Sequence, residues 1–174
     1  MPLGANKAGL LGAAGASAGA GDRGLYGGGW SYSGNAGINV IDYVTISSTG
    51  NAADFGDMSN SDAVSGCSNG TTGGRAIWDV GNSDDPQIQY VTIQTAGNAA
   101  DFGDRNAQSG GCGAVSNGSN DRGIFAGGRA PNNDPLNADF IEYVTISSTG
   151  NGTDFGNLSA GGRSYAYAAA SNGT

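Results

Sequence analysis

The chain has no histidine, and only seven of its 174 residues are lysine or arginine. Histidine is the commonest general acid–base and the commonest ligand of transition metals, so its absence argues against an enzyme and a bound metal. Fifteen acidic residues give a net charge of −8, and no basic stripe is present to neutralise phosphates. Apolar runs stay shorter than the roughly 18 residues of a membrane span. We therefore predict no enzymatic activity, no cofactor, no nucleic-acid partner and no membrane span.

The N-terminus lacks the basic region and leucine-rich core that open a secretory signal. Residues 1–21 are almost all glycine, alanine, serine and leucine, and each glycine costs a helix about 1 kcal/mol relative to alanine. Two interpretations stay open for this segment: an anchor arm that docks on a partner protein, or a degenerate first strand. We take 1–21 as the arm and 22–174 as a repeat domain.

The chain contains three similar copies of a 15-residue segment, which start at Tyr43, Tyr90 and Tyr143. Its first part, YVTI, is β-branched and aromatic and predicts a strand. In the first copy Gly50 and Asn51 tolerate positive φ, so the STGN stretch predicts a turn. An Asp-Phe-Gly sequence follows, eleven residues after the tyrosine in every copy. The segment is predicted to be a strand–turn–strand hairpin.

Two further segments accompany each hairpin. One is an apolar strand that ends in glycines, as in DRGLYGGG and DRGIFAGG, and the other is a small-residue segment that ends in SNG. Each repeat unit thus has four short β segments, with units at 22–71, 72–120 and 121–174, and no segment resembles a helix. A period near 50 residues with four strands is typical of propeller blades. The fold class is therefore predicted to be all-β.

Aromatic residues are the main source of apolar area in this glycine-rich chain. Those at repeated positions are predicted to pack in the core or in an assembly contact: Tyr43, Phe55, Tyr90, Phe102, Tyr143 and Phe155. Trp30, Tyr32 and Trp78 lie outside the repeated hairpins and are candidate surface contacts. For these three, packing between units and stacking on sugars of a host surface remain alternatives.

Several other motifs match known functional motifs, but a purely structural interpretation explains each of them better. The Asp-Phe-Gly of protein kinases is not indicated, because it occurs three times without the catalytic loop or the strand lysine. The repeated Asn-Gly-Ser/Thr sequences match glycosylation acceptors but also match turns. Cys67 and Cys112 occupy similar places and predict small buried residues, with a disulfide as the alternative. Turn aspartates are predicted to be solvated, with calcium binding as the alternative; these are Asp54, Asp57, Asp101, Asp104 and Asp154.

The apolar strand ending in Gly28-Gly29 or Gly127-Gly128, the tyrosine about fifteen residues later and the aromatic in the last strand resemble the kelch repeat. Phenylalanine stands where kelch units usually carry tryptophan, and the second unit lacks the double glycine. The wording YVTI–STGN–DFG and the opening MPLGANKAGLLGAAG resemble virion and tail-associated proteins of marine tailed phages. The resemblance implies a structural virion protein, in a tail-fibre, tail-accessory or capsid-surface role, assembled in the host cytoplasm.

Three units are too few to close a propeller, which takes roughly four to eight blades. The repeat domain begins at DRG and its last unit ends at SNGT, the segment that precedes DRG elsewhere. We therefore expect the kelch-like units to be completed by pairing between chains in a homo-oligomer, with the N-terminal arm contacting other virion proteins. The alternative is a kelch-like adhesin or lectin that binds a host glycan through the loop at 31–37 or the loop at 129–139.

Overall fold

The computed structural model describes residues 22–59, 65–70, 73–80, 86–106, 111–128, 139–159 and 169–172. The regular elements in these ranges are β-strands and a single 3-10 turn, η1 (Gly118–Asn120). The all-β prediction is confirmed. Within the same ranges no helix has the length and apolarity needed to cross a bilayer. The predicted arm at 1–21 lies outside the described residues.

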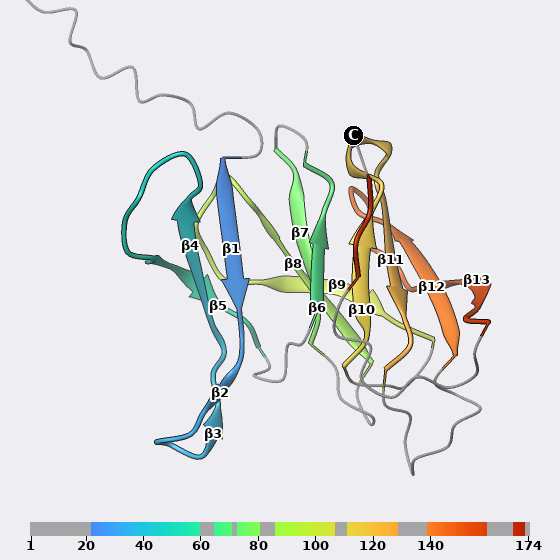
Figure 1. Ribbon diagram of the computed structural model, residues 1–174, viewed down its shortest axis with the longest axis horizontal. Coiled ribbons are helices and arrows are strands. Elements are labelled where there is room, and N and C mark those ends of the chain that lie inside the picture. The colour runs from blue at the N-terminus through green and yellow to red at the C-terminus, as the bar shows by residue number, and fades with distance from the viewer. Residues whose placement is uncertain are drawn as a thin grey trace, which may run out of the picture.

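Three antiparallel sheets carry the repeats and follow one another across the molecule in chain order (Figure 1). The first sheet has the order β1-β4-β5, formed by Arg23–Gly27, Val40–Thr45 and Ala53–Asp57. The second has the order β6-β7-β8-β9, formed by Ser65–Ser68, Arg75–Asp79, Gln87–Thr92 and Ala100–Asp104. The third has the order β10-β11-β12-β13, formed by Gly113–Ser116, Arg122–Ala126, Phe140–Thr145 and Thr153–Asn157.

The small-residue strand does not pair within the sequence unit that it closes. Instead β6 pairs with β7 and β10 pairs with β11, so each sheet joins the end of one unit to the start of the next. Among the described residues, no strand occupies the corresponding edge of β1 in the first sheet. The sheets and the sequence units are therefore offset by one strand.

A short hairpin of two strands with two residues each, β2 (Trp30–Ser31) and β3 (Ala36–Gly37), projects from the end of the first sheet (Figure 1). It forms within the polar stretch between the glycine-ended strand and the YVTI strand. Asn35 takes a positive φ of 46°, which suits the short polar side chain at a tight turn. This hairpin was predicted only as a loop.

Each repeated hairpin contains the same β-bulge. In the first sheet Ile41 pairs with Gly56 and the next residue, Asp42, pairs with Asp54, so Phe55 is the extra residue. The same shift recurs at Phe102 and Phe155. A positive φ of 150°, 140° and 139° at the glycine that follows makes the bulge possible, because glycine has no Cβ. The Asp-Phe-Gly sequence is thus a bulge signal.

The turn of the hairpin lies earlier than the sequence suggested. The Ser48 N–H donates to the Thr45 carbonyl, and the same contact recurs in the other two copies. Gly50 and Asn51 are absent from the positive-φ residues, so the expectation for these two residues was wrong. They follow the turn, and in the second and third copies the equivalent pair bonds to a neighbouring sheet.

Candidate functional site: the joints between sheets

The apolar core lies between the sheets, in two joints of the same design. One face of each sheet, here called the back face, carries the repeated tyrosine and phenylalanine; the opposite front face carries the valine and isoleucine of the YVTI strand. At the first joint the back face of the first sheet packs on the front face of the second, and buries Ile41, Phe55, Met58, Ala76, Trp78, Val80 and Val91. At the second joint the cluster comprises Ile77, Ile88, Phe102, Cys112, Phe125, Val144 and Ile146.

Backbone hydrogen bonds hold the edge of one sheet to the turn of the next. At the first joint, the Gly97 N–H donates to the Phe55 carbonyl at 2.7 Å and the Ala99 N–H to the Asp57 carbonyl at 2.8 Å. The Asn98 side-chain oxygen then accepts the Asp57 N–H at 3.1 Å. Three outward polar groups of this edge, at Phe55 and Asp57, are thereby satisfied, which protects this part of the strand edge from other pairings.

The second joint repeats these contacts with the residues one unit further on. The Gly150 N–H donates to the Phe102 carbonyl at 2.8 Å, and the Gly152 N–H to the Asp104 carbonyl at 2.7 Å. The Asn151 side-chain oxygen accepts the Asp104 N–H at 3.0 Å. We call this set of two backbone bonds and one asparagine bond the clamp.

An arginine crosses each joint beside the clamp. Arg23 donates to the Ile93 carbonyl at 3.0 Å, and Arg75 donates to the Ile146 carbonyl at 3.4 Å. Each guanidinium lies over the tyrosine ring of its own sheet, at 4.9 Å from the Tyr43 centroid and 4.3 Å from the Tyr90 centroid. Stacking on the ring orients the guanidinium toward the next sheet.

No protein-family model and no curated protein sequence matches this chain. The repeated geometry of the joints therefore carries the functional argument.

The predicted packing residues form one edge-to-face pair in each sheet. Ring centroids lie 6.0 Å apart in Tyr43–Phe55 and Tyr90–Phe102, and 6.2 Å apart in Tyr143–Phe155. Phe55 and Phe102 are buried, whereas Phe155 is exposed, because no further sheet among the described residues covers it. Phe155 therefore occupies the same position in its sheet as Phe55 and Phe102, but no neighbouring sheet among the described residues packs against it.

The candidate surface aromatics divide into two groups. Trp30 and Tyr32, on the projecting hairpin, are 54% and 93% exposed. Trp78 is buried at the first joint, so its assignment as a surface contact was wrong. It lies on the front face of the second sheet, opposite Gly66, where any side chain at residue 66 would collide with the indole. The loop at 129–139 lies outside the described residues except for Asp139.

The Asn-Gly turns also contribute to the joints. Asn69 and Asn117 accept the backbone N–H of Arg75 and Arg122 at 3.0 and 2.8 Å, which closes the turn between the first two strands of a sheet. The Asn69 side chain also donates to Asp121 of the third sheet at 2.8 Å. Desolvation alone would raise the pKa of Asp121, but the hydrogen bonds from Ser147 and Asn69 together hold this pKa below its usual range.

The described residues contain no group of three or more His, Cys, Asp or Glu side chains placed to hold a metal ion. The aspartates considered as calcium ligands are exposed and belong to the edge strands of the three sheets; they are Asp54, Asp57, Asp101, Asp104 and Asp154.

A buried ion pair distinguishes the second sheet from the others. Arg105 Nε lies 3.2 Å from Asp79 Oδ1, and both side chains are fully buried. The Cys112 thiol donates to the other Asp79 oxygen at 3.1 Å, and the Arg105 guanidinium lies 5.7 Å from the Phe140 ring centroid. Asp79 stands where the first unit has Gly27 and the third has Ala126.

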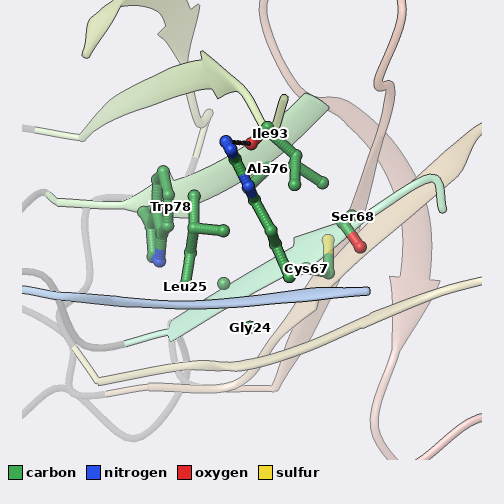
Figure 2. Close-up of a pocket in the computed structure, with 9 residues that line it drawn as sticks. Gly24, Leu25, Cys67, Ser68, Ala76, Trp78 and Ile93 are labelled. Atoms are coloured by element: carbon green, nitrogen blue, oxygen red, sulfur yellow. Dashed lines mark hydrogen bonds between the residues drawn. The ribbon is translucent and has the colours of Figure 1, made fainter. Parts of the chain in front are cut away.

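A cavity of about 330 Å³ lies beside the open edge of β1. Figure 2 shows Leu25 and Trp78 at one end of it and Cys67 and Ser68 at the other, with a hydrogen bond ending at the Ile93 carbonyl. At the second joint the small-residue strands β6 and β10 lie side by side. The cavity borders β6 in the first joint, where the described residues of the first sheet include no small-residue strand to lie beside it.

Both cysteines are free thiols in this structure. Burial raises the pKa of the Cys67 thiol from 9.0 to about 12, against a smaller lowering by a hydrogen bond from the Ile124 backbone. Burial, followed by the charge of the adjacent Asp79 carboxylate, also raises the pKa of the Cys112 thiol. Neither thiol forms a reactive thiolate near neutral pH.

We expect both thiols to react with iodoacetamide at pH 8 far more slowly in the folded chain than in urea, measured by mass spectrometry of the labelled protein. The raised pKa has a second consequence. Below pH 9 both states hold the thiol proton, but between 9.0 and about 12 the unfolded chain ionises Cys67 and the folded chain does not. Stability should therefore fall as pH rises through this window, and Cys67→Ala should reduce that fall. Fast labelling of the native chain at pH 8 would contradict the assignment.

Proposed function

We propose that this chain is a structural component of a tailed-phage particle, in a tail-fibre, tail-accessory or capsid-surface role, which assembles through its β-repeats. The observation that supports it most directly is the repeated joint: one clamp, one bridging arginine and one aromatic pair recur between successive sheets. A surface used twice within one chain in the same geometry is suited to repetition between chains.

We propose that the three sheets are kelch-like units of the propeller-blade type and that oligomerisation completes them. The proposed role is scaffolding without catalysis. The chain's own copies are its first partners, and the N-terminal arm at 1–21 is proposed to contact other virion proteins. The proposed location is the virion, after assembly in the host cytoplasm. The net charge of −8 favours a soluble subunit before assembly.

Composition analysis of purified particles tests this proposal. Mass spectrometry of particles banded in a density gradient is expected to find the chain in a fixed copy number relative to the main capsid protein. Labelling with an antibody against the chain is expected to mark one structure on each particle in electron micrographs. A chain that occurs in infected-cell lysate and is absent from banded particles would refute the proposal.

A glycan-binding adhesin or lectin is the second candidate, and the exposed Trp30 and Tyr32 favour it. Aromatic rings presented on a projecting hairpin are suited to stacking on sugars. This candidate predicts saturable binding on a glycan array that is lost in Trp30→Ala and Tyr32→Ala. Tyr26→Ala, which removes an exposed aromatic from the front face and leaves the hairpin unchanged, is the matched control. An array without hits would eliminate this candidate.

A further inference from the structure

We infer that the back face of the third sheet docks on the front face of the first sheet of a second copy, through a third joint with the same contacts as the two internal ones. The inference rests on the proposed assembly function and specifies its interface. The two halves of this joint lie on the same chain, at opposite ends of the row of sheets (Figure 1). One kind of molecule therefore supplies both.

The clamp predicts the register of this joint atom by atom. At the internal joints the acceptors are the carbonyls at Phe55 and Asp57 and then at Phe102 and Asp104. The equivalent carbonyls of the third sheet belong to Phe155 and Asn157, and no described residue donates to either. The turn of the first copy offers the equivalent donors at residues 50 and 52. The Asn51 side chain has no partner among the described residues and matches Asn98 and Asn151.

The apolar halves of the joint are also present and uncovered. On the front face, Tyr26 and Ile46 are 64% and 65% exposed, whereas their third-sheet equivalents Phe125 and Ile146 are both 0% exposed. On the back face, Phe155 is 53% exposed, whereas Phe102 is 2% exposed. The positions whose large side chains are buried at the internal joints are thus exposed on the front face of the first sheet and on the back face of the third sheet.

The bridging arginine is in place as well. Arg122 continues the series of Arg23 and Arg75, and it lies 4.4 Å from the centroid of the Tyr143 ring, as its equivalents do in their own sheets. The two internal arginines donate to the isoleucine carbonyl at the end of the next YVTI strand. In the proposed joint the acceptor is the Ile46 carbonyl of the second copy.

Docking of unlike faces is a heterologous contact, so it gives a ring if the rotation closes and an open array if it does not. Two copies would place six sheets in a ring, within the roughly four to eight that closed propellers use. In both cases every internal joint has the same polarity, back face to front face. An isologous dimer, in which the same face meets itself, would violate this polarity.

The test uses the full chain and two single variants. Phe155→Glu places a charge on the back face, and Ile46→Glu places one on the front face. We expect the wild type to have at least twice the 17.1 kDa chain mass in light scattering at micromolar concentration. Each variant should weaken association by about a hundredfold and elute as a monomer with an unchanged circular-dichroism spectrum.

Mixing the two variants separates this proposal from other modes of association. Each variant keeps one intact face, and the two intact faces are complementary. The mixture should therefore form a one-to-one complex that neither variant forms alone. One control and one further variant complete the design. Tyr32→Glu, at an exposed aromatic residue outside both faces, should assemble as the wild type does. Asn51→Ala should weaken assembly, and in the Phe155→Glu background, in which docking is blocked, it should leave the melting temperature unchanged.

A monomeric wild type, a Phe155→Glu or Ile46→Glu variant that assembles as the wild type does, or a mixture without the one-to-one complex would each overturn the inference. These outcomes are distinct from failure of the proposed function. A chain that is found in purified particles but stays monomeric in solution would refute only the docking joint, whereas a chain that assembles but is absent from particles would refute only the role in the virion.

Discussion

Replacing Asp79 by alanine is expected to lower the free energy of unfolding by about 3–5 kcal/mol, because the change leaves the buried Arg105 guanidinium without its carboxylate. Nε of Arg105 and Oδ1 of Asp79 lie 3.2 Å apart, and water reaches neither side chain. The Cys112 thiol also loses the oxygen to which it donates. Urea unfolding followed by tryptophan fluorescence measures the loss, with Trp78 as a reporter inside the first joint.

The matched control is the double variant Asp79→Gly with Arg105→Met, which gives the second sheet the pair that the first sheet has. There Met58 fills the space above Gly27, and a Cβ at residue 27 would lie only 3.1 Å from the methionine methyl group. Replacing both members of a buried ion pair by well-packed apolar groups is often neutral or stabilising. We therefore expect the double variant to recover most of the loss. A double variant as unstable as the sum of the two single ones would show that the residues act independently.

The ion pair also shows what repeat comparison can and cannot predict. The second unit departs from the other two at Asp79 and again at Arg105, which stands where Met58 and Leu158 stand. The sequence shows both departures. What it could not show is that two positions 26 residues apart meet across a third strand, since that requires the pairing of β7, β8 and β9.

Local pattern was sufficient for the strands and insufficient for the joints. The β-branched and aromatic runs at Tyr43, Tyr90 and Tyr143 predicted strands that the structure contains. The Gly-Asn that follows was assigned to a turn, because its short-range preferences suit one. In the second and third copies its glycine instead bonds to the backbone of a neighbouring sheet, and local preference gives no information on such a partner. The signal that could have found it is the identity of Gly-Asn in all three copies.

The aromatic residues show the same limit. Trp30 and Trp78 each follow an apolar strand segment, yet one is exposed and the other buried. Their fates differ because Trp78 lies within the strand β7, covered by the back face of the first sheet, while Trp30 lies in the projecting hairpin. The sheet that packs on Trp78 decides its burial, and local sequence does not specify that sheet.

A second large effect is expected from Gly103→Ala. Any Cβ at Gly103 would lie 2.5 Å from the Gly150 carbonyl oxygen, which is backbone and cannot rotate away. Its φ of 140° adds the strain of a region that side chains avoid, about 1–3 kcal/mol. Separation of the two segments would also break the three bonds of the second clamp, at about 1 kcal/mol each. The total expected loss of unfolding free energy is therefore about 4–6 kcal/mol by these two contributions.

Gly156→Ala isolates the contact from the strain. Gly156 has nearly the same φ, 139°, but no atom of the described residues lies within 4 Å of a Cβ at that position. Measured in the Ile46→Glu background, in which docking of a second copy is blocked, this variant should lose only the strain of about 1–3 kcal/mol. Equal losses in the two variants would show that the clamp contributes nothing to stability. We expect a larger loss of unfolding free energy in Gly103→Ala. We also expect Gly156→Ala, without the Ile46 change, to lose assembly and keep its fold. The two results together would show that the same glycine geometry is needed at the joints within a copy and at the joint between copies.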